Sequence, residues 1–286
     1  MAAFERSFYM KTTGGIFCVG VPEIGCGPLN ALLGSEQHCL PFKVTVGKYV
    51  RISNQKILLD DGQVIDANQA SIYHGDVSFT TLAPQILERN RNTLKTLRGM
   101  PEDGFFWLLG NHTSCKNESA VQSALRKTTS PSLNGLLDYL YTGFAHSRRD
   151  SDNHDASAAV GLLGAGPGLT PAGDDAIAGV MLALLRFQRA DLVKAIWKAI
   201  ESSLPVLTNE ISAAHLEQAA EGFCSESMNE VLDQIFQAEE IEAATLVTAL
   251  NGMGCTSGWD TLGGVAMVID AWQYSLNTTH RTVITC

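Results

Sequence analysis

In the first eighty residues, apolar side chains occur in short alternating or clustered runs, and this pattern is typical of β-strands. Apolar residues occupy every second position from Leu40 to Val46, the period of a half-buried strand. Turn residues such as Asp60-Asp61-Gly62 separate further short apolar runs at 14–20, 50–52, 57–59 and 64–65. We therefore expect residues 1–80 to form a β-rich region, either an antiparallel meander or a small barrel.

From Leu82 onward the apolar spacing changes to three and four residues, the period of an amphipathic helix. Pro131 is expected to end one helix and precede another, because proline interrupts the helical hydrogen bonds. The expected helices cover residues 82–99, 120–127, 133–141, 176–189, 192–201, 207–222, 228–236, 241–250 and 262–272. The fold class is thus α+β, with a mostly helical domain at 81–286 after the β-rich region.

A glycine-rich loop precedes the most apolar of these helices. Four glycines fall between Gly161 and Gly168, too many for the interior of a helix or strand. Thr170 is expected to cap the following helix, and Pro171 to occupy its first position. A glycine loop that leads into a helix N-terminus presents N–H groups that suit an anion such as phosphate.

The chain repeats this pattern once, at residues 252–264. Each copy has two glycines two residues apart, then a threonine, a glycine, an aspartate two residues later and a glycine four beyond that. Asp175 and Gly179 share one helix face, as do Asp260 and Gly264. The two helices are therefore expected to pack side by side at their glycines, with Asp174, Asp175 and Asp260 gathered where the loops meet.

Several roles remain open for these groups. Loop N–H groups and the hydroxyls of Thr170, Thr256 and Ser257 can bind phosphate or carboxylate oxygens. Clustered carboxylates can orient an amide, hold Mg²⁺ or act as a general base, but aspartates in a first helical turn also simply stabilise helices. His215, on a predicted helix with Asn209 and Glu210, is a further candidate acid–base group.

Composition narrows the class of protein. The chain has 286 residues, 45% of them hydrophobic, and a net charge of -10. This charge argues against nucleic acid and against an anionic membrane surface as partners. We see no signal peptide, the apolar run from Ala176 to Leu185 is too short to span a bilayer, and the seven cysteines include no C-x-x-C pair. We therefore expect a cytoplasmic protein without a disulfide framework.

The quoted motifs resemble a known family. They are Gly164-x-Gly-Pro-Gly-Leu-Thr-Pro-x-Gly-Asp-Asp175, then Ser212 and Ala219-Ala-Glu-Gly222, then Gly254-x-Thr-Ser-Gly-x-Asp260. They are similar to the AllH family, also called YlbF, over residues of about 160 to 265. The resemblance implies one of three different subunits of an oxamate carbamoyltransferase in purine and allantoin degradation. That enzyme converts oxalurate and phosphate to oxamate and carbamoyl phosphate.

The resemblance and the chemistry of the loops together assign roles. Asp174, Asp175 and Asp260 would be catalytic, orienting the carbamoyl amide or holding a metal. The expected substrate-binding residues are Gly166, Gly168, Leu169, Thr170, Thr256, Ser257 and Gly258. Members often carry histidine at the position of Cys255, which puts a catalytic role for that position in doubt here.

The loops lack one group that dianionic substrates usually require. Neither loop contains arginine or lysine, so the cation is expected from Arg51, Arg186, a metal or a partner subunit. The expected partners are the other carbamoyltransferase subunits and a small anion, namely phosphate, oxalurate or oxamate. The sequence indicates no cofactor firmly, although the clustered aspartates could bind Mg²⁺. Two alternatives stay open: a stand-alone Mg²⁺-dependent hydrolase or lyase, and a non-catalytic assembly subunit.

Overall fold

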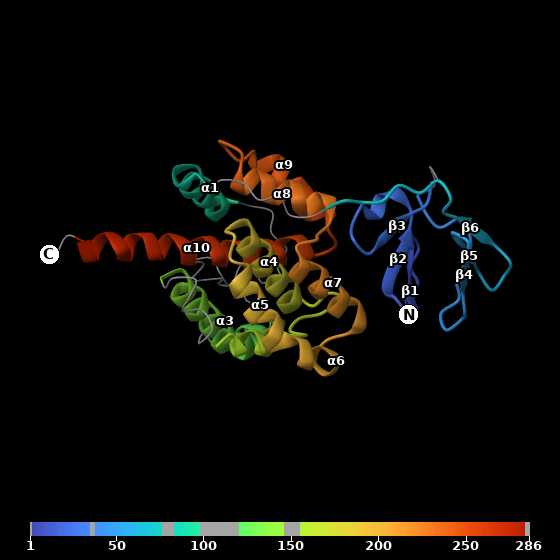
Figure 1. Cartoon of the computed structure of the whole chain (residues 1–286), viewed down its shortest axis with the longest axis horizontal. Helices are drawn as coiled ribbons and strands as arrows, with labels where there is room; N and C mark the ends of the chain where they lie inside the picture. The colour runs from blue at the N-terminus through green and yellow to red at the C-terminus, as the bar shows by residue number, and fades with distance from the viewer. Residues whose placement is uncertain (1, 35–37, 76–82, 98–119, 146–154, 284–286) are drawn as a thin grey trace. The chain divides into compact units, whose positions relative to one another are not determined.

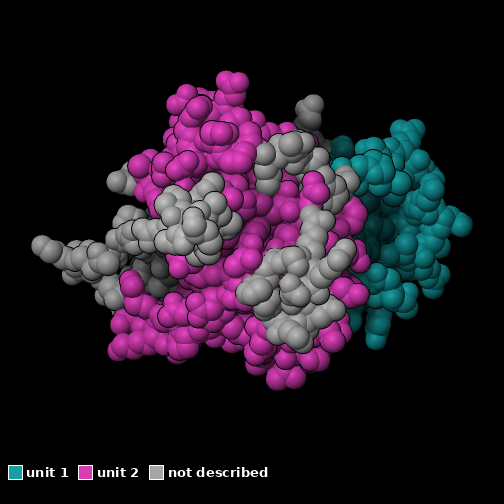
Figure 2. Space-filling view, turned by 60° about the vertical axis from the view of Figure 1, so that its left-hand side comes forward, with its two compact units in different colours: residues 1–75 teal, residues 76–286 magenta. Residues whose placement is uncertain are grey.

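The computed structural model describes residues 2–34, 38–75, 83–97, 120–145 and 155–283, with side chains at 120–122 and 278–283 left aside. Figure 1 shows the helices and strands. The chain divides into two compact units, residues 1–75 and 76–286, coloured separately in Figure 2. The domain boundary expected between residues 80 and 81 lies outside the described residues.

The first unit contains two three-stranded sheets. In one, β1 (Ser7–Thr12) pairs antiparallel with β2 (Gly15–Gly20), and β2 pairs parallel with β3 (Asn30–Leu32). A 3-10 helix, η1 (Pro22–Ile24), lies in the crossover that a parallel pair requires. The other sheet is an antiparallel meander of β4 (Arg51–Ser53), β5 (Lys56–Leu58) and β6 (Val64–Asp66). The described strands form no closed barrel; the second sheet is the predicted antiparallel meander, whereas the parallel pairing of β2 and β3 in the first sheet departs from that prediction.

The strand predicted from Leu40 to Val46 is wrong. These residues form no strand, although Leu40, Phe42 and Val44 still pack against the core of the first unit. The Phe42 ring meets the Phe8 ring edge to face, with centroids 6.1 Å apart. Pro41 has no N–H to donate to a neighbouring strand, so this segment contributes apolar side chains without joining a sheet.

The second unit is helical, which confirms the α+β class. Its α-helices are α1 (Pro84–Thr96), α3 (Ala120–Ala145), α4 (Ala172–Arg186), α5 (Ala190–Ile200), α6 (Leu204–Leu207), α7 (Glu210–Glu221), α8 (Glu226–Phe236), α9 (Ala243–Gly252) and α10 (Ser257–Val283). Two 3-10 helices, η3 (Ser157–Leu162) and η4 (Glu201–Ser203), precede α4 and α6. Among the described residues no helix is both long and apolar enough to cross a membrane.

Helices α4 and α10 form the centre of this unit (Figure 1). α4 packs against α10, α5 and α7, while α10 also contacts α1, α3 and α9. Almost every residue of α4 is buried, as its nearly uniform apolar sequence predicts. α10 begins five residues before the predicted 262–272 helix and continues well beyond it. The two helices that carry the repeated motif are therefore the core of the domain.

The predicted break at Pro131 is wrong, because α3 continues through this proline. Hydroxyl groups before the proline bond to carbonyls of the preceding turn: Thr129 donates to Leu125 O at 2.7 Å and Ser130 to Arg126 O at 2.5 Å. These bonds do not replace the helical hydrogen bond that Pro131, which has no N–H, cannot donate, and bonds of this kind bend a helix. Burial of the apolar side chains that follow then outweighs the local cost of the proline.

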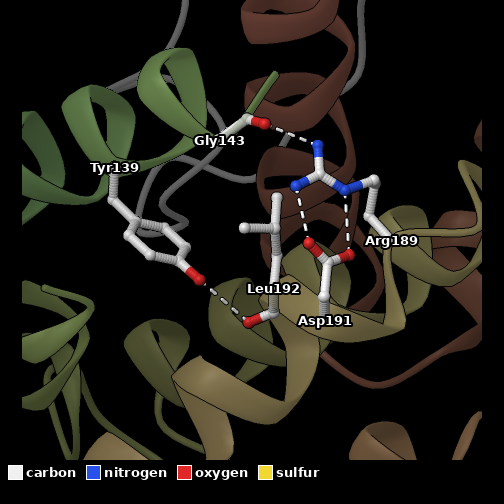
Figure 3. A network of polar contacts seen from close by, with 5 residues as sticks. All are labelled: Tyr139, Gly143, Arg189, Asp191 and Leu192. Carbon is white, nitrogen blue, oxygen red and sulfur yellow. Dashed lines mark hydrogen bonds and ion pairs between the residues drawn. The ribbon is translucent and has the colours of Figure 1, made fainter. Parts of the chain in front are cut away.

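A buried polar network ties α3 to the start of α5 (Figure 3). The Arg189 guanidinium donates to both carboxylate oxygens of Asp191, at 2.9 and 2.7 Å, and to the Gly143 carbonyl at 2.5 Å. The Tyr139 hydroxyl donates to the Leu192 carbonyl at 3.0 Å. These contacts use the polar groups of α3 and α5 structurally, away from the glycine loops.

Candidate functional site

The repeated motif forms the crossing of α4 and α10. A Cβ atom on Gly179 would lie 1.9 Å from the Thr261 carbonyl oxygen, and one on Gly264 would lie 1.9 Å from that of Ala176. Neither position has room for any side chain. This confirms the predicted packing of the two helices at their glycines, and it brings their N-terminal loops together.

A hydrogen bond joins the two loops. The hydroxyl groups of Thr170 and Ser257 are 2.9 Å apart, although 87 residues separate them in sequence. The prediction that Thr170 caps α4 is wrong, because the N-cap residue is Pro171 and no side chain caps the helix. The Thr170 hydroxyl instead bridges to the other copy of the motif.

The N-terminus of α4 is largely occupied by the chain itself. The Gly173 N–H donates to Ala165 O at 2.8 Å, and the N–H groups of Asp174 and Asp175 donate to Pro171 O at 2.9 and 3.0 Å. These N–H groups are therefore not available to bind an anion, contrary to the expectation from the sequence. The available donors lie earlier in the loop.

Gly166 and Gly168 have φ angles of 111° and 107°, which other residues rarely adopt. Within the part of the chain that the structure describes, the N–H groups of Gly166 and Gly168 meet no acceptor. Pro167 between them has no N–H, so these two separated donors, rather than a run of successive N–H groups, are the loop groups that could bind an anion.

Asp174 holds the first loop in place. Its Oδ1 accepts the Gly164 N–H at 2.8 Å, and its Oδ2 accepts the Ser212 hydroxyl at 2.6 Å and the Thr208 hydroxyl. Both oxygens of this buried carboxylate are thus used within the protein. The contacts join the loop to the start of α7, so the structure places Asp174 in a supporting position.

Asp175 has a very different environment. It is only 9% exposed, and its Oδ2 has no hydrogen-bond partner. Burial raises the pKa of this carboxyl well above its usual value, and the neighbouring Asp260 raises it further. The hydroxyls of Ser257 and Thr170 act in the opposite direction and lower the same pKa.

Asp260 lies in the first turn of α10 and is completely buried. Its N–H donates to the Thr256 carbonyl at 2.9 Å. Because the Asp260 charge raises the pKa of the Asp175 carboxyl, the two buried carboxyls are coupled, and double ionisation of the pair is disfavoured. Such a pair can hold a proton at neutral pH and donate or accept it.

Comparison with known proteins agrees with this geometry. Residues 162–269 match the family described as oxamate carbamoyltransferase subunit AllH. The predicted resemblance to the AllH family is confirmed over these residues. The matched residues, called the AllH segment below, run from the end of η3 into α10 and include both glycine loops and all three aspartates. No solved structure matches the chain.

The remaining predicted residues of the AllH segment differ in accessibility. Leu169 is 39% exposed and Thr256 is half-buried, so both can be reached from solvent. Gly258 is buried, and a Cβ there would lie 2.5 Å from the Leu250 carbonyl oxygen. Gly258 therefore has a packing role against α9. Cys255 is an exposed free thiol.

His215 lies on α7 and is a poor proton donor. Burial lowers its pKa to about 4, so the imidazole is neutral at physiological pH. The sequence left the role of His215 open, and its lowered pKa indicates a neutral side chain.

The functional residues that sequence reasoning missed are Thr208 and Ser212. Only the Ser212 position in the family motif gave any signal for them.

The source of a cation is not within the loops. Arg186 is buried and pairs with Asp233 at 2.7 Å. Because Arg186 ends α4 and Asp175 lies in its first turn, about 16 Å of helix separates them. Arg51 belongs to the first unit. Across the described residues, no group of three or more histidine, cysteine or acidic side chains is arranged to hold a metal ion.

A separate hollow of ≈ 260 Å³ lies between α3 and α10, with Arg126, Tyr141 and Asp270 in its lining. Asp270 already forms an ion pair with Arg91. Along α10, Asp270 is about 15 Å from Asp260, so this hollow is distinct from the paired loops.

Proposed function

We propose that the chain is a subunit of an oxamate carbamoyltransferase-type enzyme, which converts oxalurate and phosphate to oxamate and carbamoyl phosphate. The observation that carries this proposal is that the AllH match spans both glycine loops, which the Thr170–Ser257 hydrogen bond joins. The reaction site lies at these paired loops.

The loops supply the groups that this reaction needs. Phosphate or the substrate carboxylate is bound by the N–H groups of Gly166 and Gly168 and by the hydroxyls of Thr170, Thr256 and Ser257. The same donors stabilise the negative charge that develops on the carbamoyl oxygen when phosphate attacks. The carboxyl pair lies behind the hydroxyls and orients them.

Other subunits complete the site. Two anionic substrates near two buried carboxyl groups require a positive charge, which neither loop contains. Arg186 is engaged by Asp233, so a basic residue of another chain is the proposed source. The family description names a subunit, which agrees with an enzyme assembled from several chains.

The test is to produce the chain together with the products of its neighbouring genes and to measure carbamoyl phosphate formed from oxalurate and phosphate. We expect activity in the wild-type assembly and a loss on the order of 10²-fold for Ser257→Ala and for Asp260→Asn. Asp138→Asn, at an exposed position on α3, is the matched control and should retain activity. An inactive wild-type assembly, or full activity in both site variants, would contradict the proposal.

A further inference from the structure

The least expected group in the site is the Oδ2 atom of Asp175. This atom is buried and has no hydrogen-bond partner, whereas both carboxylate oxygens of the adjacent Asp174 accept hydrogen bonds. A buried carboxylate without a partner is costly, so the site favours the neutral acid. The neighbouring carboxyl of Asp260 is fully buried as well.

Two hydroxyl groups of the loops interact with the Asp175 carboxyl. Thr170 and Ser257 are partly exposed, are hydrogen-bonded to each other at 2.9 Å and interact with the Asp175 carboxyl. The charged groups that face Asp175 are Asp260 on α10 and Asp174 on α4. A hydroxyl group can accept a proton on one side and donate its own on the other.

We infer that Asp175 and Asp260 hold one proton between them, and that the Thr170 and Ser257 hydroxyls pass it between this pair and the substrate nitrogen that leaves. This inference rests on the proposed function. Asp175 itself remains buried, so it acts through the hydroxyls and is a positioning and proton-holding residue. Thr170 and Ser257 are the residues that contact substrate.

The proton balance of the reaction fits a pair with one proton. Phosphate enters as HPO₄²⁻, and one of its oxygens forms a bond to the carbamoyl carbon of oxalurate. The bond from that carbon to the oxamate nitrogen breaks, and its electron pair stays on nitrogen. A hydroxyl gives the nitrogen a proton and takes one from Asp175, while the proton of HPO₄²⁻ returns through the hydroxyls to Asp260. The pair carries one proton before and after turnover.

The first test uses the isolated chain and does not depend on activity. Infrared spectroscopy at pH 7 should show the carbonyl band of a protonated carboxylic acid, absent in Asp175→Asn and retained in the exposed control Asp138→Asn. Asp260→Asn should shift the loss of this band to lower pH, because the like charge is removed. A spectrum without the Asp175 band at pH 7, or a midpoint unchanged by Asp260→Asn, would overturn the shared proton.

The second test uses the assembled enzyme. Asp175→Asn should lower kcat on the order of 10²-fold with little change in KM for oxalurate, because Asp175 does not touch the substrate. Thr170→Val combined with Ser257→Ala should lose kcat, whereas Thr170→Ser, which keeps the hydroxyl, should lower kcat far less. Wild-type kcat in Asp175→Asn or in the double variant would overturn the relay. An inactive wild-type assembly would instead overturn the proposed function, and the infrared result would still stand.

Discussion

Asp174 and Asp175 are adjacent in sequence but have opposite energetic effects. Both lie in the first turn of α4 and both are buried. Asp174 accepts three hydrogen bonds, from Gly164, Thr208 and Ser212. The Oδ2 of Asp175 accepts none, and its other neighbour of note is the like-charged Asp260. The Asp174 carboxylate stabilises the fold, whereas burial and Asp260 disfavour the charged form of Asp175.

Removing the Asp174 carboxylate should destabilise the protein. Asp174→Ala leaves three buried or half-buried donors without an acceptor, at about 1–3 kcal/mol for each lost bond to a charged group. Chemical denaturation monitored by circular dichroism measures the change. Ser212→Ala, which removes only one of these donors, should cost less. Equal stability of Asp174→Ala and wild type would contradict the supporting role.

Removing the Asp175 carboxylate should stabilise the protein at neutral pH. The raised pKa in the folded state means that folding favours the protonated form, so stability is highest at low pH and is lost as pH rises from about 4 toward the folded pKa. Asparagine stays neutral throughout. Asp175→Asn should therefore have a higher Tm than wild type at pH 8 and nearly the same Tm at pH 4.

The sign of this pH dependence is the decisive observation. Asp138→Asn, at an exposed site, should change Tm little at either pH. A lower Tm for Asp175→Asn at pH 8 than for wild type would show that the carboxylate is stabilised in the fold, contrary to its buried and unpartnered Oδ2.

At the scale of elements, the crossing of α4 and α10 decides the geometry of the site. The apposed glycines allow the backbones to touch, so both loops are fixed relative to one another. The rest of the domain supports this pair: α7 holds the first loop through Asp174, and α9 packs against Gly258 at the second. The positions of the two loops therefore depend on the packing of residues that lie outside the loops.

Alanine at either crossing glycine should therefore be strongly destabilising. Gly179→Ala and Gly264→Ala each place a methyl group 1.9 Å from a carbonyl oxygen of the other helix, so the helices must separate at a cost of about 3 kcal/mol or more. Gly252→Ala is the matched control, since it lies in α9 with open space around it and should be neutral or stabilising. Thermal unfolding of the three variants provides the comparison. Equal Tm values would show that the crossing is loose.

The same helices show how much of the fold and of the candidate site can be predicted from the sequence. Apolar spacing predicted the positions of the helices, and the repeated glycines predicted which two would meet. It did not predict that α3 continues through Pro131, because the burial of the apolar side chains that follow the proline exists only in the folded protein. It also could not separate the roles of Asp174 and Asp175. Thr208 and Ser212 lie 34 and 38 residues from Asp174, and Asp260 lies on a different helix from Asp175, so only packing brings these partners close.

At the scale of the whole molecule, the two units have separate cores of very different size. The core of the first unit is built from five buried residues: Phe8, Met10, Val19, Ile57 and Leu59. The core of the second unit is continuous and extends from Leu87 to Ala271. Since stability grows with buried apolar surface, the helical unit is expected to fold without the first unit. The AllH segment lies entirely within it.

Separate production of residues 1–75 and 76–286 tests this expectation. The longer fragment should be helical by circular dichroism and should unfold cooperatively near the Tm of the helical transition in the full chain. Residues 1–75 should be marginally stable, because a chain of this length buries little apolar surface. The infrared band of Asp175 provides an internal check, because the carboxyl pair and both loops belong to the longer fragment. A fragment 76–286 that lacks cooperative unfolding would show that the first unit is required to form the helical core.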